Sequence, residues 1–308
     1  MPRSLAREQD ILTRRPPKRP PSLTSRRIGI HTSTAGGVHN AAERAYRLGC
    51  NALQVFSTSP RQWAPYELGE LQCEQMNRLR AKYDLKPLVI HTNYLVNLAS
   101  SNELFLQKSI EAFRGEVERA LTLCADYLVL HPGSFRGTDR EAGLLQTAAA
   151  IAAATQDLDL AQSGLTILIE NTAGSEFSLG GSFEQVAEIL DRLRGIVPIA
   201  ACIDTCHVHV AGYDIVSEEG IYQTLQHIDA AIGLNHVKVW HCNDAKAGRG
   251  SKLDRHQHIG KGTIGKETFR ILLNDLRLTH SAFIAETPID KPGDDRRNVE
   301  ALKKLVKP

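Results

Sequence analysis

Nine histidine, aspartate and glutamate residues give this sequence the donor set of a catalytic metal site. Imidazole nitrogen and carboxylate oxygen are the ligands that zinc takes in catalytic sites. Asp204 and His207 are close enough in the sequence for both side chains to project from the end of one strand. Asp254 and His256 are alternate residues, whose side chains point the same way in an extended loop. Four crowded carboxylates repel one another unless cations lie between them. We therefore predict divalent-metal ligands at His91, His131, Glu170, Asp204, His207, His241, Asp254, His256 and Glu286.

The predicted strands explain how residues spread so widely along the chain can meet. Eight short apolar runs are interpreted as strands: Ile28–His31, Ala52–Phe56, Pro87–His91, Asp126–His131, Leu165–Glu170, Pro198–Asp204, Asn235–His241 and Ala282–Glu286. Longer amphipathic stretches between them are interpreted as helices, among them Asn40–Leu48, Leu71–Tyr83, Glu103–Leu123, Gly143–Gln162, Phe183–Arg194 and Lys266–Leu276. Seven of the eight runs end at a residue that can bind a metal or move a proton, and only the run that ends at Phe56 does not.

Strands that are apolar nearly throughout are typical of parallel sheets covered by helices. Eight strand–helix units over about 280 residues predict an α/β fold, a (β/α)8 TIM barrel in a single domain. In such a barrel every strand opens its carboxyl end on one face, so the seven side chains should converge. An open doubly wound sheet is the alternative, but the Gly36-Gly37 pair lacks the glycine spacing of a dinucleotide-binding loop.

Each predicted ligand has an ordinary explanation when it is taken alone. A single histidine after a strand is usually a core or surface residue, and Glu170 followed by Asn171 could cap the next segment. These explanations would have to hold together at seven strand ends, so the pattern favours a shared metal site. Cys206 and Cys242, which adjoin predicted ligands, are interpreted as packing residues.

The composition is that of a globular protein. With 42% hydrophobic and 23% charged residues, the 308-residue chain is neither collagen-like nor a small disulfide scaffold. No apolar run approaches the roughly 18 residues of a membrane span. Six cysteines without a C-x-x-C pair favour buried thiols in a reducing compartment. We expect a cytoplasmic protein that is monomeric by default.

Charge is unevenly distributed along the chain. The formal net charge is +2, yet residues 1–27 carry eight basic side chains against Glu8 and Asp10, which makes this segment +6. Residues 28–308 carry 29 basic and 33 acidic groups, or −4. The Arg/Pro-rich composition disfavours helix and predicts a flexible basic arm over residues 1–27, followed by the barrel domain over 28–308. The arm lacks the apolar core of a secretory signal, and a nuclear or organellar address is the alternative to a simple extension.

Two loops on the predicted active face carry planar side chains. Arg61, Gln62 and Trp63 follow the second strand, and Tyr94 follows His91 by three residues. Planar groups on such loops can wedge into a base stack or fill the gap left by a displaced nucleotide. Simple packing of the loops is the alternative for Trp63 and Tyr94. Basic residues after the seventh strand are candidates for phosphate contacts or for a solvated loop: Lys246, Arg249, Lys252 and Arg255.

Taken together, these motifs resemble the endonuclease IV family of apurinic/apyrimidinic endonucleases. The matching stretches run from about residue 28 to the C-terminus: His31-Thr32-Ser33 with Gly36-Gly37, Arg61-Gln62-Trp63, His131-Pro132-Gly133-Ser134, Ile169-Glu170-Asn171-Thr172-Ala173-Gly174, Asp204-Thr205-Cys206-His207 with Ala211-Gly212-Tyr213-Asp214, Asn243-Asp244-Ala245-Lys246, Asp254-Arg255-His256 and Glu286-Thr287. The resemblance covers all of the chain except the basic arm, and the blocks are highly specific in combination.

The resemblance implies a TIM barrel with three zinc ions, with Mn²⁺ as an alternative at some sites. By that resemblance, the first zinc is held by His91, His131 and Glu170. Glu170 then bridges to the second, which is completed by Asp204, His241 and Glu286. The third is held by His207, Asp254 and His256.

The resemblance also implies a DNA repair activity on double-stranded DNA. We expect the protein to hydrolyse the phosphodiester 5′ to an abasic site, which leaves a 3′-hydroxyl and a 5′-deoxyribose phosphate. Trimming of blocked 3′ ends is expected as a second activity. Glu170 and Glu286 would position the nucleophile. Arg61 and Tyr94 match positions that the family inserts at the lesion, and His31, Gln62 and Trp63 are expected beside them.

This sequence departs from the family pattern at positions that are not metal ligands: Ser59, Pro60, Thr92, Phe135 and Lys261. These departures affect the expected grip on DNA rather than the chemistry. A metal-dependent sugar isomerase or epimerase on a related barrel is the alternative function, because such enzymes also gather histidine and carboxylate ligands at strand ends.

Overall fold

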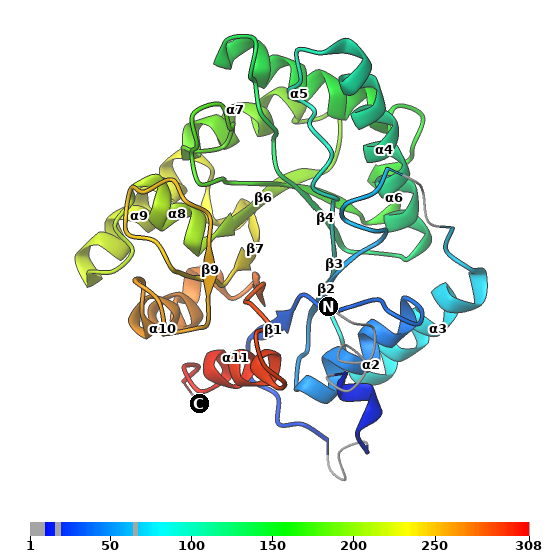
Figure 1. The fold of residues 1–308 in the computed structure, drawn as a ribbon, viewed down its shortest axis with the longest axis vertical. Coiled ribbons are helices and arrows are strands. Elements are labelled where there is room, and N and C mark those ends of the chain that lie inside the picture. The colour runs from blue at the N-terminus through cyan, green and yellow to red at the C-terminus, as the bar shows by residue number, and fades with distance from the viewer. Residues whose placement is uncertain (1–9, 16–19, 64–66, 308) are drawn as a thin grey trace.

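The protein is an eight-stranded parallel barrel surrounded by helices (Figure 1). The computed structural model describes residues 10–15, 20–63 and 67–307. The strands are β1 (Arg27–Ile30), β2 (Leu53–Phe56), β3 (Leu88–His91), β4 (Tyr127–Leu130), β5 (Thr166–Glu170), β6 (Ile199–Asp204), β7 (Val237–His241) and β10 (Ala282–Ala285). They pair in the order β1-β10-β7-β6-β5-β4-β3-β2, and a bridge between His31 and Gln54 joins the two ends. The predicted single-domain TIM barrel is confirmed.

Helices connect most successive strands and cover the outside of the barrel. They are α2 (His39–Leu48), α3 (Glu70–Tyr83), α4 (Glu103–Thr122), α5 (Arg140–Thr155), α6 (Leu160–Ser163), α7 (Phe183–Leu193), α8 (Thr205–Ala211), α9 (Glu218–Ala231), α10 (Lys266–Asn274) and α11 (Asp294–Lys303). Short 3-10 turns η1 (Ile11–Thr13), η2 (Leu234–His236) and η3 (Leu276–Leu278) complete the set, and β8 (Asp244–Ala245) pairs with β9 (His256–Gln257) in the loop after β7.

The structure corrects one predicted helix and adds three. The stretch predicted as Gly143–Gln162 is divided into α5 and α6, and between them Asp157 adopts a left-handed φ of 66°, which a continuous helix does not accept. Helices α8, α9 and α11 were not predicted. The first of these begins directly at the end of β6, where Asp204 caps its amino end by accepting a hydrogen bond from the backbone of His207.

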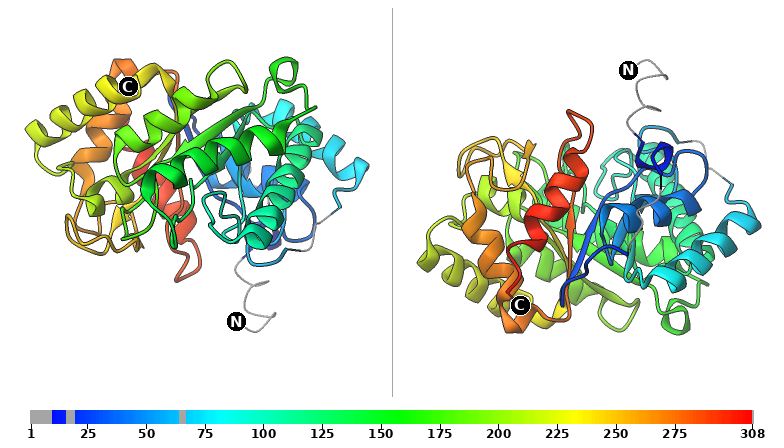
Figure 2. Two further views of the ribbon diagram at one scale, coloured as in Figure 1. Left: turned by 90° about the horizontal axis from the view of Figure 1, so that it is seen from above. Right: turned by 90° about the horizontal axis from the view of Figure 1, so that it is seen from below.

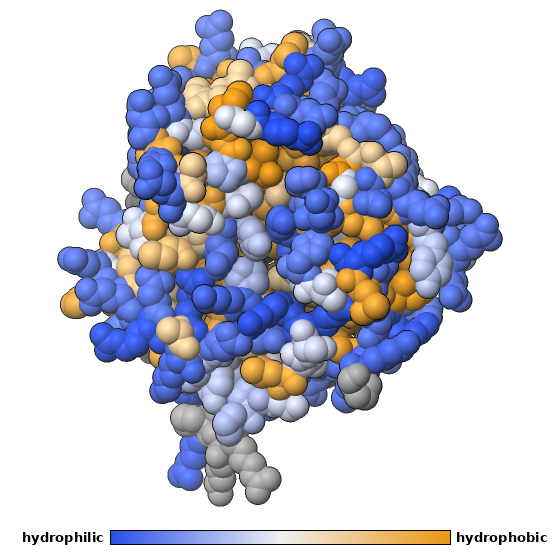
Figure 3. Space-filling view, turned by 180° about the vertical axis from the view of Figure 1, so that it is seen from behind, coloured by the Kyte–Doolittle hydropathy of each residue, from blue (hydrophilic) through white to orange (hydrophobic). Residues whose placement is uncertain are grey.

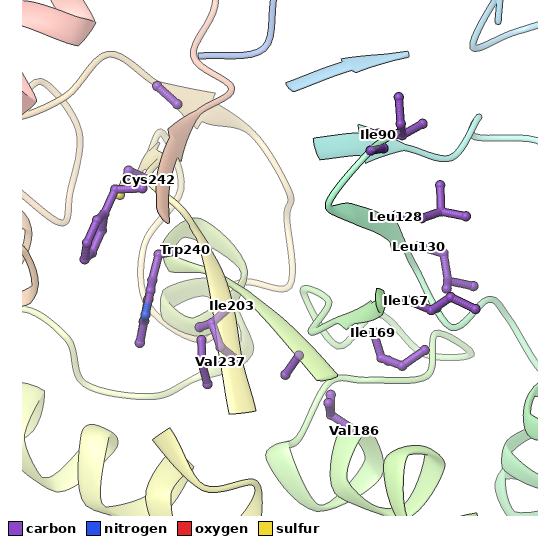
Figure 4. Close-up of a cluster of buried hydrophobic side chains, with 14 of the residues drawn as sticks. Ile90, Leu128, Leu130, Ile167, Ile169, Val186, Ile203, Val237, Trp240 and Cys242 are labelled. Atoms are coloured by element: carbon purple, nitrogen blue, oxygen red, sulfur yellow. The ribbon is translucent and has the colours of Figure 1, made fainter. Parts of the chain in front are cut away.

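Alternate residues of each strand belong to two different cores. One core lies between strands and helices, where Leu128, Leu130, Ile167 and Ile169 pack with Val186 of α7 (Figure 4). Because successive strand side chains point to opposite faces, the intervening residues face the barrel interior. These interior residues form a separate small cluster: Ala52, Val89, Val129, Leu168, Ala200, Cys202, Val239, Ala282 and Ile284.

Glycine at one strand position allows the barrel to close. Gly29 lies in β1, and a Cβ placed there would come 2.5 Å from the carbonyl oxygen of Ala52 and 2.7 Å from a side-chain carbon of Ile284. Both distances are shorter than real Cβ contacts, so a side chain here would force β1 away from its neighbours.

Part of the predicted flexible arm is ordered against the barrel. Within the described residues 10–15 and 20–27, the turn η1 packs on α2, and Arg27 already belongs to β1. The side chain of Arg47 donates to the carbonyl oxygens of Ile11 and Arg14. The basic residues Arg3, Arg7, Lys18 and Arg19 lie outside the described residues.

Two of the longer loops extend from one end of the barrel. The loop after β10 (red) and the loop around β9 (orange) project from the same end (Figure 2). The face turned away from the viewer of Figure 1 is mostly hydrophilic, with hydrophobic residues in smaller groups between (Figure 3). Among the described residues, no helix combines the length and the apolar character needed to cross a membrane.

Candidate metal centre

Each of the eight barrel strands places one functional side chain in a common layer at its carboxyl end. Seven members of this layer lie two residues after a member of the interior cluster, and the eighth follows Gly29 at the same spacing. Because the strand repeat is two residues, all eight positions face the barrel interior. The layer consists of His31, Gln54, His91, His131, Glu170, Asp204, His241 and Glu286.

Glu170 is the centre of this layer. Its carboxylate is fully buried, and Oε2 lies 3.1 Å from Nε2 of His91 and 3.1 Å from Nε2 of His131. The other oxygen, Oε1, lies 2.8 Å from Nδ1 of His241. One carboxylate therefore contacts three imidazoles from three strands, and each of its oxygens faces a different group of donors.

A second group of donors shares Glu170 with the first. Ligand atoms of Glu170, Asp204, His241 and Glu286 all lie within 4.8 Å of one another, as do those of His91, His131 and Glu170. The residues of both sets that the family resemblance implies therefore lie close together in the structure.

The third group is carried by helix α8 and the loop before β9. Nε2 of His207 lies 3.3 Å from Oδ2 of Asp254, and Nε2 of His256 lies 3.2 Å from Oδ1 of the same carboxylate. His256 also approaches the second group, since its Nε2 is 3.6 Å from Oδ2 of Asp204. All nine predicted ligand residues are thus brought together at one end of the barrel.

Backbone carbonyls fix the orientation of three imidazole rings. Nδ1 of His91 donates to the carbonyl oxygen of Thr92 at 2.8 Å, and Nδ1 of His207 donates to that of Asn171 at 2.8 Å. Nδ1 of His256 donates to the carbonyl of Glu286 at 3.1 Å. Each ring therefore keeps its Nε2 lone pair for the donor cluster, as in metal sites whose ligands are oriented by an outer hydrogen bond.

Asparagine side chains hold the carboxylates in place. Asn243 donates to Oδ2 of Asp204 at 2.5 Å and accepts from the backbone N–H of Glu286 at 2.8 Å. Asn171 accepts from the backbone N–H of Asp204 at 2.7 Å. These bonds set the positions of two strand ends relative to each other.

The donor set fits divalent cations. Among the described residues, Nε2 of His256 is buried and has no hydrogen-bond partner, although two carboxylates lie beside it. A buried ring nitrogen that faces two carboxylates requires a proton or a cation between them. The mixture of imidazole and carboxylate, without thiolate, is typical of catalytic zinc.

Several side chains of the donor cluster bind protons strongly. Although burial opposes the charged form, Asp204 and Asp254 raise the pKa of His207 to about 10 and that of His256 to about 9. Burial opposes the charged form of Glu286 as well, but His241 and His31 lower the pKa of its carboxyl far below the ordinary value. Protons thus partly neutralise the cluster in the place that cations would take.

Two cysteines near the donors are thiols. Cys202 lies beside Glu170 and His241, and Cys206 lies beside Asp204 and His256. Burial raises the pKa of Cys202 to about 12 and also raises that of Cys206. Both thiols are fully buried among apolar side chains, and we interpret them as packing residues.

The planar residues expected to face DNA are exposed on neighbouring loops. Arg61, Gln62 and Trp63 are all exposed after β2, and Tyr94 is 63% exposed after β3. Trp63 also packs edge-on against Phe105 of α4, at 5.4 Å between ring centroids, so packing and exposure are combined at this residue.

Three of the departures from the family pattern are in well-defined surroundings. The carbonyl of Pro60 accepts a hydrogen bond from the backbone N–H of Tyr94 at 3.2 Å, which joins the two loops with planar side chains. The carbonyl of Thr92 fixes the ring of His91, and Phe135 packs against Phe177 at 5.9 Å between ring centroids. Ser59 and Lys261 are exposed.

A cavity of about 670 Å³ lies between the loops after β1 and β2. Its lining includes His31, Phe56, Pro60 and Ile289. Nδ1 of His31 is 3.7 Å from Oε1 of Glu286, so the cavity adjoins the donor cluster. His31, one of the residues expected to contact DNA, therefore links this cavity to the predicted ligands.

One member of the layer was not predicted from the sequence. Gln54 is fully buried and contacts His31, His241 and Glu286. Candidate residues were sought at the last position of each run, which for β2 is Phe56. Counting in steps of two from the interior residue Ala52 would have selected Gln54 instead.

The chain is similar in sequence and in structure to known proteins. The chain is 47% identical over 282 residues to a protein named probable endonuclease 4 from Solibacter usitatus, covering 91% of this chain and 97% of the relative. The crystal structure of endonuclease IV from Thermus thermophilus superposes with a TM-score of 0.79 at 35% identity, covering 91% of this chain and 98% of that one. The chain belongs to the endonuclease IV family.

This endonuclease IV family member also shares its fold with a wider group. Residues 42–305 match a family described as xylose isomerase-like TIM barrel. The crystal structure of a D-tagatose 3-epimerase-like protein superposes with a TM-score of 0.66 at 19% identity, covering 91% of this chain and 96% of that one. At that identity the likeness concerns the fold alone. Family membership makes the chain a hydrolase of the endonuclease type.

Proposed function

We propose that this endonuclease IV family member hydrolyses the phosphodiester 5′ to abasic sites in double-stranded DNA, using three zinc ions. The observation that carries the proposal is the arrangement of nine imidazole and carboxylate side chains in three adjoining groups, two of which share Glu170. Three adjoining cation sites suit a phosphodiester, whose nucleophile, phosphoryl oxygens and leaving oxygen all carry or develop negative charge.

Each cation has its own set of residues in this proposal. The first would be held by His91, His131 and Glu170, the second by Glu170, Asp204, His241 and Glu286, and the third by His207, Asp254 and His256. When bound, the cations supply positive charge to the phosphate and activate water at neutral pH. Zinc is proposed because of the imidazole-rich donor set, and Mn²⁺ remains an alternative at one or more sites.

The chain's own carboxylates position the attacking water. Glu170 is fully buried at the centre of the layer, and the side chain of Glu286 is 17% exposed beside it. We assign Glu286 to hold the water in line with the phosphorus, because its carboxylate is the more accessible of the two. Cleavage of the bond between the phosphorus and the 3′ oxygen would leave a 3′-hydroxyl and a 5′-deoxyribose phosphate as products.

The exposed loops supply selectivity for the lesion. Arg61 and Tyr94 would enter the duplex at the abasic nucleotide, with Gln62, Trp63 and His31 beside them. An abasic nucleotide costs little to displace from the stack because no base pair has to be broken. A blocked 3′ end offers the same phosphate with less chain attached, so trimming of 3′-phosphates and related blocks is proposed as a second activity.

The test uses the full-length protein and a duplex that carries one abasic site. Nicking on the 5′ side of the lesion, abolished by a chelator and restored by zinc, is expected, with products resolved beside markers of known ends. An undamaged duplex of the same sequence is the control. No nicking, together with about one metal ion per chain and turnover of a ketose sugar, would overturn the proposal in favour of the epimerase alternative. We further propose a monomer that acts in the cytoplasm, where the DNA of its bacterial relatives lies.

A further inference from the structure

We propose that Gln54 is a positioning residue that selects which nitrogen of His241 faces the metal cluster and that holds the carboxylate of Glu286 in place. The inference rests on the proposed function for its kinetic consequence but not for its consequence on metal binding. Gln54 is fully buried in β2 and, like His31, is a member of the layer that belongs to none of the donor groups.

The side-chain amide of Gln54 contacts three members of the layer. Its Oε1 lies 2.8 Å from Nε2 of His241. Its Nε2 lies 2.5 Å from Oε1 of Glu286 and 3.0 Å from Nδ1 of His31. The amide therefore crosses from β2 to the ends of β7, β10 and β1.

The oxygen of the amide decides the tautomer of His241. An amide oxygen only accepts hydrogen bonds, so Nε2 of His241 carries the proton. The lone pair is left on Nδ1, which lies 2.8 Å from Oε1 of Glu170 and 3.4 Å from Oε2 of Glu286. His241 thus offers Nδ1 to the cluster, whereas His91, His207 and His256 offer Nε2.

The nitrogen of the amide holds Glu286. One N–H donates to Oε1 of Glu286 and the other is directed at Nδ1 of His31, so both protons of the amide are used. Reversing the amide would place its oxygen against the carboxylate of Glu286, where both groups can only accept hydrogen bonds. The contacts therefore allow a single orientation of Gln54, and through it a single arrangement of His241 and Glu286.

Loss of this amide should weaken metal binding without disturbing the contact with substrate. Residues that orient metal ligands from outside typically contribute about 10- to 100-fold to metal affinity. The side chain of Gln54 is fully buried within the layer, so it does not reach a bound duplex. A lower kcat with an unchanged KM for abasic DNA is the expected kinetic signature.

Two variants separate the two halves of the amide. Gln54→Met keeps the length of the side chain and removes both the acceptor and the donors. Gln54→Glu keeps an acceptor for Nε2 of His241 but removes the N–H groups that serve Glu286. Gln185→Met is the matched control, because Gln185 accepts one backbone hydrogen bond, from Gly180, and belongs to none of the donor groups.

The readouts are zinc affinity, measured by competition with a chromogenic chelator, and the visible absorption spectrum of the cobalt-substituted protein. Gln54→Met should lower zinc affinity by about 10- to 100-fold and change the cobalt spectrum, whereas Gln54→Glu should keep a spectrum close to that of the unmodified protein. Gln54→Met and Gln54→Glu should both lower kcat.

Unchanged zinc affinity and spectrum in Gln54→Met would overturn the inference, as would an equal loss in Gln185→Met. A Gln54→Glu protein with the same altered spectrum as Gln54→Met would overturn the assignment of the His241 contact. If the unmodified protein does not cut abasic DNA, the proposed function fails, but the zinc and cobalt measurements still decide the role of Gln54. Thermal unfolding of each variant identifies any that does not fold.

Discussion

Asp10 and Arg44 join the N-terminal segment to a loop at the candidate site. Nε and Nη2 of Arg44 both donate to the carboxylate of Asp10, at 3.0 and 2.5 Å. The same guanidinium donates to the carbonyl oxygens of Ser33 and Ala35, at 2.8 and 2.9 Å, in the loop that lines the cavity beside His31. The segment before β1 is therefore connected through one buried arginine to the face where chemistry is proposed.

This contact predicts that the stability of the fold depends on pH in the acidic range. Burial opposes the charge of Asp10, but hydrogen bonds from Arg44 and from the backbone of Leu12 lower the pKa of its carboxyl below the ordinary 3.8. Because the pKa of Asp10 is lower in the folded chain than in the unfolded chain, its ionised carboxylate stabilises the fold. This contribution to the free energy of unfolding is complete at pH values above the ordinary pKa and is lost as the pH falls through the pKa of the folded chain. Asp10→Asn should therefore unfold more readily than the unmodified protein near neutral pH, and the difference should disappear in strong acid. Urea unfolding across this range measures it, and a constant difference at every pH would contradict it.

Glu286→Gln should strongly slow the nicking of abasic DNA while leaving the fold intact. The amide cannot supply the second negative oxygen to the cluster, and removing one such electrostatic contribution costs roughly 100- to 1,000-fold in kcat. Single-turnover nicking at saturating protein measures the effect. The exposed Glu188→Gln on α7 is the control, and full activity in Glu286→Gln would rule out its proposed role.

Removal of metal should lower both activity and stability. The cluster gathers four carboxylates around five imidazoles, and ions that bind only the folded chain stabilise it in proportion to their affinity and concentration. Dialysis against a chelator should lower the midpoint of thermal unfolding, and zinc should restore the midpoint together with nicking. Full recovery of activity with magnesium alone would show that the zinc assignment is wrong.

Tyr94→Ala should weaken the grip on lesion-containing DNA. Tyr94 is exposed beside the cluster, and stacking of an aromatic ring on a base contributes about 1–3 kcal/mol. The variant should bind abasic duplex roughly tenfold more weakly or worse, with less effect on undamaged duplex, in a binding assay with the metal-loaded protein. The exposed Tyr222→Ala on α9 should bind like the unmodified protein. Equal losses on both duplexes would contradict a role at the lesion.

Gly29→Ala should destabilise the barrel because its Cβ would meet the backbone of Ala52. Overpacking of this kind costs typically about 1–3 kcal/mol. Gly248→Ala is the control, since a Cβ there meets nothing within 4 Å. Denaturant unfolding compares the two variants, and equal free energies of unfolding would show that closure at β1 tolerates a side chain.

The barrel and the ligand set could be predicted from the sequence because both depend on local patterns. Apolar runs mark strands, and residues such as His91 and Glu170 stand at the ends of those runs, where a parallel barrel gathers them. Gln54 was missed because β2 continues for two residues past the functional layer, so the end of the run pointed to Phe56. The order of Asp10 against Arg44 was also missed, since a contact between distant positions leaves no periodic pattern in a basic, proline-rich segment.

The closing strand pair has a consequence for the order in which the protein matures. β1 is near the start of the chain and pairs in register with β10 near its end, through four residue pairs from Arg27–Ala282 to Ile30–Ala285. A chain emerging from the ribosome therefore holds β1 without one of its two neighbours until synthesis is almost complete. Glu286 arrives with β10, so the last step of folding also delivers the last carboxylate. The group of donors that includes Glu170 and Glu286 is then completed at the same time as the barrel. A chain that ends before residue 286 has neither the complete donor group nor the closed barrel.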